Sequence, residues 1–142
     1  MLLNVLQRPD GSIDEETRYI LKELSKWFSV CAEGVYATRP WRVFGEGDTR
    51  VLIQGFTEEK PSWNDSDYRF VTKNGALYAF LMHAPESRVT VIKSLTPQEH
   101  VRSVEVLGTG SVPFSQAFGV LTVQLPQELP TPYTNCLKIC FS

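Results

Sequence analysis

The stretch that decides the fold of this chain is Tyr68-Arg69-Phe70-Val71-Thr72-Lys73-Asn74-Gly75-Ala76-Leu77-Tyr78-Ala79-Phe80. Two runs rich in aromatic and β-branched residues flank an Asn-Gly pair. Both positions of a two-residue hairpin turn require positive φ, which Asn and Gly adopt at low cost. The stretch therefore predicts a β-hairpin with its turn at Asn74-Gly75.

The apolar pattern keeps a period of two on the C-terminal side of this hairpin. Leu121, Val123 and Leu125 share one face of a strand, and Leu137 and Ile139 repeat the pattern near the end of the chain. Strands are predicted at Asp67–Thr72, Ala76–His83, Arg88–Ser94, Val101–Leu107, Gly119–Leu125 and Asn135–Phe141. Half-buried strands in series, with no helical pattern between them, predict a mainly β chain with an antiparallel β-sandwich.

A helix is predicted before the strands. Ser12 and Glu15 have the spacing of a capping box, with Ser12 as the N-cap. A broad apolar stripe follows at helical spacing, formed by Ile20, Leu21, Leu24, Trp27 and Phe28. Because this stripe carries two large aromatic residues, it requires an extensive partner surface. Between helix and hairpin, Thr38–Gly55 is predicted as a linker, with one short strand at Val51-Leu52-Ile53.

The bulk composition is that of a globular chain. It has 142 residues, 42% of them hydrophobic, which is enough for one domain with a core, or for one domain and part of a neighbour. A net charge of −2 gives no basic footprint, so neither nucleic acid nor an anionic membrane surface is an expected partner. No apolar run reaches the roughly 20 residues of a membrane-spanning helix. The sequence leaves the localisation of the protein open.

The three cysteines are Cys31, Cys136 and Cys140. Cys136 and Cys140 lie four apart on one face of a predicted strand, which separates them by roughly 13 Å, beyond disulfide reach. Their spacing does not favour a shared metal ion either. We interpret them as small strand residues and predict no disulfide, no metal site and no cofactor.

Hydrolysis by a pair of carboxylates needs the two carboxyl groups held close together, and the carboxylates here favour structural roles. Glu58-Glu59 has the character of a solvated loop. Asp65 and Asp67 flank Ser66 in a turn-rich stretch that favours turn hydrogen bonds. Glu33 is expected to pair with Arg39. We therefore predict no catalytic residue among them.

The histidines and aromatic residues also favour structural roles. His83 and His100 have no acid and nucleophile at a spacing that suggests a triad. Asn64-Asp65-Ser66 has the form of a glycosylation sequon, which matters only in a eukaryotic secretory context. Four aromatic residues outside the helix are candidates for stacking on a sugar, with packing onto a neighbouring surface favoured for each: Trp41, Trp63, Tyr68 and Tyr133. Trp63 is expected to be the most exposed, because its neighbours are polar.

Leu2-Leu3-Asn4-Val5, then Asp10-Gly11 and then Glu33–Trp41 stand ahead of the predicted strands. This order of segments resembles the α-L-fucosidases of glycoside hydrolase family 29. Leu2-Leu3-Asn4-Val5 with Asp10-Gly11 resembles the end of their catalytic barrel, and Glu33–Trp41 resembles its exit segment. The remaining matches follow the start, middle and end of their C-terminal sandwich: Asp67–Lys73, Leu77–Ala79, Ile92–Leu95, Val104–Gly108, Gly119–Pro126 and Leu137–Ile139.

The chain departs from the family pattern at two points. Leu6-Gln7 replaces a Gly-Pro pair beyond the last barrel strand, which alters the rim where a barrel's active site lies. Cys31-Ala32 replaces an Asn-Gly pair at the end of the helix. Because glycine supplies the left-handed residue that ends many helices, we expect the helix to continue and to end with Gly34 in that role.

The resemblance implies two parts. Residues 1–41 would be the terminal strand, helix and exit segment of the barrel, and 42–142 the C-terminal β-sandwich. In the family, the catalytic nucleophile, the acid/base and the fucose-gripping histidines come from barrel segments upstream of such a chain. The implied function is that of a non-catalytic C-terminal portion of a fucosidase. Its partner would be the barrel, and a fucosylated glycan would bind the intact enzyme.

Two alternatives remain open from the sequence. In the first, the chain is a free-standing sandwich that binds a glycan or a protein, with the Trp27–Phe28 stripe folded back onto it. In the second, the chain completes a separately encoded barrel. Without a barrel, the exposed helix stripe predicts self-association, because a large apolar patch is seldom left in water.

Overall fold

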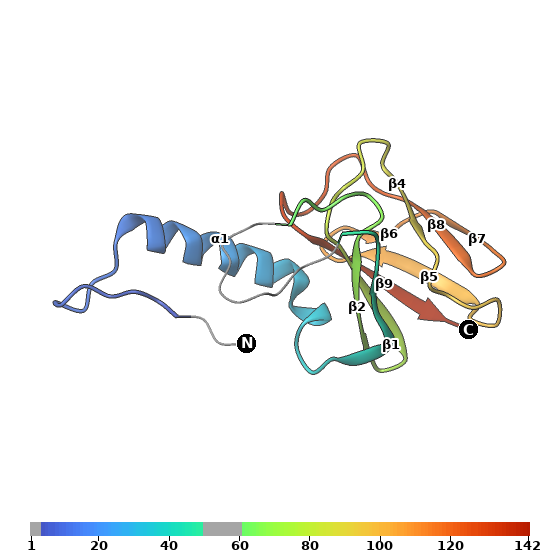
Figure 1. Ribbon diagram of the computed structural model, residues 1–142, viewed down its shortest axis with the longest axis horizontal. Helices are drawn as coiled ribbons and strands as arrows, with labels where there is room; N and C mark the ends of the chain where they lie inside the picture. The colour runs from blue at the N-terminus through green and yellow to red at the C-terminus, as the bar shows by residue number, and fades with distance from the viewer. Residues whose placement is uncertain (1–3, 50–60) are drawn as a thin grey trace.

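The computed structural model describes residues 4–49 and 61–142 of the chain. One α-helix, α1 (Glu15–Cys31), continues into a short 3₁₀ turn, η1 (Ala32–Gly34), and leads to two packed antiparallel sheets. In Figure 1, the first turns of α1 project away from the sheets, whereas its last turns lie against them. In the described part of the chain, no helix has the length and apolarity to cross a membrane. The predicted β-sandwich is confirmed.

Among the described residues, the larger sheet has six strands in the order β1-β2-β3-β9-β5-β6, and the smaller has three in the order β4-β8-β7. The larger sheet contains β1 (Arg39–Glu46), β2 (Tyr68–Lys73), β3 (Ala76–Leu81), β5 (Val101–Val106), β6 (Gly110–Ser111) and β9 (Asn135–Phe141). The smaller contains β4 (Val89–Ile92), β7 (Phe114–Ala117) and β8 (Val120–Gln124). All the strand pairs are antiparallel.

The predicted hairpin is present. β2 and β3 pair from Tyr68 opposite Leu81 to Lys73 opposite Ala76. The turn residues Asn74 and Gly75 have φ of 52° and 78°, which is the left-handed conformation that this pair of residues favours.

The main core lies between the two sheets. Leu121 and Val123 of β8 face Leu137 and Ile139 of β9 across it, and all four are fully buried. The alternation predicted for both strands is therefore confirmed. A buried hydrogen bond between the hydroxyls of Tyr68 and Thr90 joins β2 to β4, so the polar groups of both residues are satisfied inside the core.

A second, smaller cluster lies on the outer face of the larger sheet, beneath the end of α1. It contains Cys31, Ala76, Tyr78, Leu107 and Cys136. The ring of Trp27 lies 6.1 Å from that of Phe80, centroid to centroid, and its indole N–H donates to the carbonyl oxygen of Thr134 at 2.7 Å. The C-terminal half of the helix is therefore part of the sandwich fold.

The structure corrects the predicted linker. Residues Arg39–Glu46 form β1, which pairs with β2 and has Trp41 and Val43 on its inner side. The charged residues and glycine in this segment mask an alternation of period two. The strands β6 and β7 were also missed. The two residues of β6 are too few to show a periodic pattern, and β7 has only one large apolar residue, Phe114. The predicted strand at Val51-Leu52-Ile53 lies outside the described residues.

Both ends of the helix differ from the prediction. Asp14, not Ser12, is the N-cap, and its carboxylate accepts from the backbone N–H of Thr17 at 2.7 Å. Ser12 instead donates to Asp10 in the preceding turn. The helix does continue past Cys31, but the left-handed residue is Ala37, with φ of 58°, and not Gly34. A Cβ at Gly34 would lie 3.0 Å from the Cys136 sulfur, so this glycine permits close packing instead.

The barrel strand expected at Leu2–Val5 is not formed at Asn4 and Val5, while Leu2 and Leu3 lie outside the described residues. A strand is held by the ladder of a neighbouring strand. Residues 4–8 have no such neighbour among the described residues, and they are exposed.

Candidate functional site

A groove of about 660 Å³ separates α1 from the larger sheet. One wall is the exposed side of the helix, and the other is formed by the outer faces of β2 and β3 and by the chain before β9. Its lining residues are Tyr19, Ile20, Glu23, Leu24, Trp27, Arg69, Phe80, Met82, Tyr133 and Thr134. We call it the helix-side groove.

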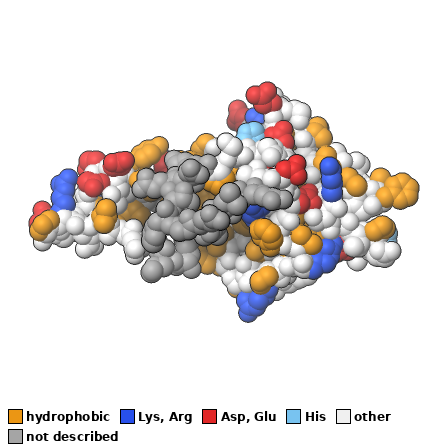
Figure 2. All heavy atoms as spheres, viewed as in Figure 1, with side chains coloured by type: hydrophobic (Ala, Val, Ile, Leu, Met, Phe, Trp, Pro, Cys, Tyr) orange, Lys and Arg blue, Asp and Glu red, His pale blue; other side chains and the backbone are white. Residues whose placement is uncertain are grey.

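The helix-side groove is mostly apolar and open to water. Tyr19 is 62% exposed, Ile20 54% and Tyr133 51%. Figure 2 shows hydrophobic side chains on the projecting helix, outside the sandwich. Large apolar side chains in such a groove mark an interaction surface, because keeping them in water costs free energy.

Two charged residues lie at the groove. Glu23 accepts hydrogen bonds from Lys26 and from the Tyr133 hydroxyl, and the bond from Lys26 lowers the pKa of its carboxyl. The guanidinium of Arg69 lies 5.1 Å from the ring centroid of Phe44 and 4.9 Å from that of Trp63. Cation–π contact with two rings therefore orients this cation at the groove.

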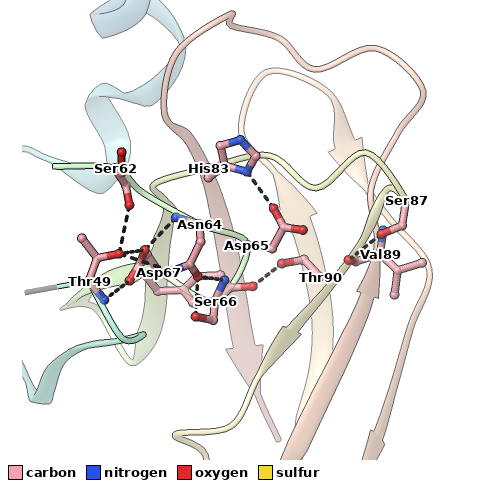
Figure 3. Close-up of polar contacts among 11 residues, drawn as sticks. Thr49, Ser62, Asn64, Asp65, Ser66, Asp67, His83, Ser87, Val89 and Thr90 are labelled. Carbon is pink, nitrogen blue, oxygen red and sulfur yellow. Dashed lines mark hydrogen bonds and ion pairs between the residues drawn. The ribbon is translucent and has the colours of Figure 1, made fainter. Parts of the chain in front are cut away.

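A polar cluster surrounds Asp67, which is 1% exposed (Figure 3). Its carboxylate accepts from the backbone N–H of Asn64 at 2.7 Å and from the Thr49 backbone N–H and hydroxyl at 3.2 and 2.6 Å. Burial raises the pKa of Asp67, but these hydrogen bonds outweigh it, so the pKa is lowered overall. The carboxylate holds residues 49 and 64 together.

Gly47 completes this cluster. It has φ of +113°, and a Cβ there would lie 2.1 Å from a carboxylate oxygen of Asp67. Glycine is therefore required both by the backbone conformation and by the close approach of the chain to the carboxylate.

Glu33 has partners other than the predicted one. Its carboxylate accepts from Lys138 at 2.7 Å and from the Tyr78 hydroxyl at 2.8 Å. Arg39 instead donates to the carbonyl oxygen of Thr38. The bond from Lys138 lowers the pKa of Glu33. The expectation of a Glu33–Arg39 pair is wrong because β9 brings Lys138 beside the end of the helix.

The two aspartates of the turn have separate structural partners. Asp65 is paired with His83 at 2.7 Å on an exposed surface, while Asp67 is enclosed by its hydrogen bonds (Figure 3). The turn hydrogen bond predicted for Asp67 is present, because its carboxylate accepts from the Asn64 backbone N–H, whereas the Asp65 side chain pairs with His83 instead of bonding within the turn. Glu58-Glu59 lies outside the described residues. His100 is exposed at the start of β5, and its backbone carbonyl accepts from Ser142.

The cysteines are all free thiols. Burial raises the pKa of Cys31 to about 11 and also raises that of Cys136. Such thiols are poor ligands and poor nucleophiles at neutral pH. Within residues 4–49 and 61–142, no three His, Cys, Asp or Glu side chains are grouped to hold a metal ion.

The aromatic candidates separate clearly. Tyr68 is buried in the core, Trp41 packs edge-on against Phe70, and Trp63 is half-buried against Arg69. Tyr133 is the most exposed of the four candidates, so the expectation for Trp63 is wrong. The polar residues beside Trp63 in the sequence suggested exposure, but they do not show that Arg69 packs over the Trp63 ring.

Several groove residues were missed from the sequence, chiefly Tyr19, Phe80 and Met82. A signal existed in β3, where Leu77, Tyr78, Ala79 and Phe80 are consecutive. An uninterrupted apolar run indicates a strand covered on both faces, and α1 covers part of the outer face here.

Comparisons with known proteins agree with this architecture. Residues 60–140 match the family model of the α-L-fucosidase C-terminal domain. The tissue α-L-fucosidase of Mus musculus is 30% identical over 133 residues, which cover 92% of this chain and 25% of that protein. The chain thus spans about a quarter of the length of this relative.

Solved structures share the fold. The α-fucosidase of Thermotoga maritima, in complex with a mechanism-based inhibitor, superposes with a TM-score of 0.71 at 21% identity, covering 97% of this chain and 29% of that one. The α-L-fucosidase isoenzyme 1 of Paenibacillus thiaminolyticus gives 0.70 at 18% identity, covering 100% and 30%. Because the family model matches more than half of the chain and the architecture is shared, this chain belongs to the α-L-fucosidase C-terminal domain family.

Proposed function

We propose that this chain serves as the non-catalytic C-terminal portion of an α-L-fucosidase and that it supports a catalytic barrel. Residues 1–41 would end the barrel and 42–142 would form the sandwich, with β1 crossing this boundary as the physical link. In the intact enzyme, hydrolysis of terminal α-L-fucose would take place in the barrel. The relatives named as fucosidases are about four times longer, which supports this division.

The helix-side groove is the observation that carries the proposal. The projecting half of α1 presents Tyr19 and Ile20 to water, while its other half is held on the sandwich by Trp27. A barrel surface seated against the groove would cover these side chains. Burying an aliphatic or aromatic side chain stabilises such a contact by about 1.5–3 kcal/mol. The sandwich would then fix the last barrel helix from outside.

Activity is the first test. The purified chain is expected to release no 4-nitrophenol from 4-nitrophenyl α-L-fucoside above the blank. Turnover that follows the chain through purification would show that it contains a catalytic carboxylate pair, and it would overturn the non-catalytic assignment.

The docking surface has its own test. In light scattering across concentration, the purified chain is expected to self-associate through the uncovered groove. Ile20→Asp places a charge at the groove and is expected to reduce association. Ser25→Asp adds the same charge at an exposed position of α1 that does not line the groove, so it is expected to leave association unchanged. Equal effects of both variants would contradict the assignment of the surface.

One contact favours the alternative, a free-standing binding module. Because Trp27 bonds to Thr134, the helix is fastened to the sandwich without a barrel. This reading predicts a monomer at all concentrations and retention of the chain on a glycan array through exposed Tyr133. Loss of that retention in Tyr133→Ala would support the module.

A further inference from the structure

The turn before β2 contains the sequence Asn64-Asp65-Ser66, the acceptor pattern for N-linked glycans. All three side chains are exposed. The turn closes with a hydrogen bond of 3.0 Å from the Asp67 backbone N–H to the Asn64 carbonyl oxygen, so it lies just outside the ladder of β2. A large substituent at this position would not displace the core.

The side chain of Asn64 is held in a defined orientation (Figure 3). Its side-chain oxygen, Oδ1, accepts from the backbone N–H of Ser66 at 2.9 Å and from the Ser66 hydroxyl at 2.6 Å. Its amide nitrogen donates to the Thr49 hydroxyl at 3.2 Å. Since a carboxamide carries two N–H groups, a bond to sugar at this nitrogen still leaves one N–H for Thr49.

The backbone below the side chain is fixed independently. The buried carboxylate of Asp67 holds the Asn64 backbone N–H at 2.7 Å. The Asn64 side-chain amide and the Ser66 hydroxyl therefore lie on the exposed side of the turn, and the Asp67 carboxylate holds its buried side in place. Asn64 does not line the helix-side groove. A glycan on Asn64 would therefore leave the helix-side groove free for a catalytic barrel.

From these contacts we propose that Asn64 is an N-glycosylation site, which is independent of the proposed barrel docking. The donor class is an oligosaccharide linked to a lipid through diphosphate. A bond forms between the Asn64 amide nitrogen and the anomeric carbon of the first sugar. The bond from that carbon to the diphosphate oxygen breaks, the lipid diphosphate leaves, and one amide proton is lost to a base.

The test is to direct the 142-residue chain into the secretory pathway of eukaryotic cells with a cleavable signal sequence and to measure its intact mass. The expected result is the added mass of one glycan, which peptide-N-glycosidase removes with conversion of Asn64 to Asp. Both Asn64→Gln and Ser66→Ala are expected to abolish the added mass, whereas Ser66→Thr is expected to retain it.

Two controls make a negative result informative. Asn74→Gln alters an exposed asparagine that has no hydroxyl residue two positions later, and it is expected to leave the added mass unchanged. Ala76→Thr, made in the Asn64→Gln background, creates a new acceptor at Asn74 and reports entry of the chain into the donor's compartment. A glycan on this control, with an unmodified wild-type chain, would overturn the proposal.

A folding readout accompanies the mass measurement. The glycosylated chain and its enzymatically deglycosylated form are expected to unfold at similar temperatures, because the turn is exposed. A large fall in the unfolding temperature of the glycosylated form would show that the turn does not accommodate a glycan, and it would contradict the structural argument.

Discussion

The indole N–H of Trp27 donates to the carbonyl oxygen of Thr134 at 2.7 Å, across 107 residues of sequence. This bond joins the helix to the chain that leads into β9, the central strand between β3 and β5. Trp27 marks the boundary between two parts of α1. Beyond it, Val30 and Cys31 pack against the sandwich, and before it, residues such as Tyr19 and Ile20 line the open groove.

Trp27→Phe is expected to destabilise the chain by about 1 kcal/mol, the contribution of one hydrogen bond. Trp27→Ala also removes the contacts of the ring with Phe80, and it is expected to cost about 3 kcal/mol. Chemical denaturation followed by circular dichroism measures both changes. Lys22→Ala, on the exposed side of the helix, is the control and is expected to have little effect. If Trp27→Ala matched that control, the helix would not be held as described.

Asp67→Asn is expected to lower the free energy of unfolding at pH 7 by about 2 kcal/mol, because hydrogen bonds to a buried charged acceptor are lost. Since folding lowers the pKa of Asp67 below its ordinary value of 3.8, the carboxylate stabilises the fold at pH values above 3.8. This contribution is lost as the pH falls through the folded pKa. The difference between wild type and variant is therefore expected to shrink below pH 3.8.

Urea denaturation at several pH values measures this difference. Asp65→Asn is the matched control, because it removes the exposed pair with His83, and such pairs contribute about 0–1 kcal/mol. A constant difference for Asp67→Asn across the whole range would show that its charge does not stabilise the fold.

Gly75→Ala is expected to destabilise the chain by about 1–2 kcal/mol, the cost of a left-handed alanine. Beyond the two adjacent residues, no atom lies within 4 Å of the Cβ that would be added, so the loss reports backbone conformation without a steric clash. Thermal unfolding measures it. Asn74→Gly retains the turn conformation and is the control. A neutral Gly75→Ala would contradict the positive φ assigned to this turn.

Phe118→Asn is expected to stabilise the chain by about 1 kcal/mol, because Asn tolerates the left-handed conformation that Phe118 occupies. Phe118 has φ of 50° and is 94% exposed at the tip of the β7–β8 hairpin, the position that Asn74 occupies in the β2–β3 hairpin. Phe118→Ala removes the ring without relieving the backbone, and it is expected to give no gain. The unfolding temperatures of the three proteins decide the point, and equal values for both variants would contradict the backbone explanation.

Cys31 and Cys136 are expected to react slowly with a thiol reagent at pH 8 in the folded chain, because burial raises the pKa of both thiols. Cys140, which is half-buried, is expected to react first. A disulfide reagent that releases a coloured thiolate measures the labelling rate of each cysteine by absorbance. Denaturant is expected to make the three labelling rates equal. Fast labelling of all three in the native state would contradict the packing beneath α1.

Much of the fold followed from local patterns. The strands with clear alternation, such as β8 and β9, were predicted close to their observed bounds, because each places one apolar face in the core. β1 was missed because only Trp41, Val43 and a glycine lie on its inner side. Two apolar side chains are too few to give a periodic signal. The N-cap was misplaced because Ser12 and Asp14 both suit the position, and only the path of the preceding turn selects between them.

The candidate site was less accessible to prediction. The apolar helix stripe indicated a docking surface, but the second wall comes from β2, β3 and the chain before β9, whose arrangement depends on long-range pairing. The same reason explains Glu33. Arg39 is close in sequence, whereas Lys138 is brought beside Glu33 by the pairing of β9 with β3.

The sequence by itself determined the β-sandwich, the hairpin at Asn74-Gly75 and the amphipathic helix, because φ preferences and apolar periods of two and 3.6 act over a few residues. Only the tertiary structure decided which half of the helix is covered and which residues form the groove. It also decided that Asp67 joins residues 49 and 64 beneath the exposed Asn64 side chain. These relationships arise where segments distant in sequence meet, and no local preference encodes the partner that a side chain finds there.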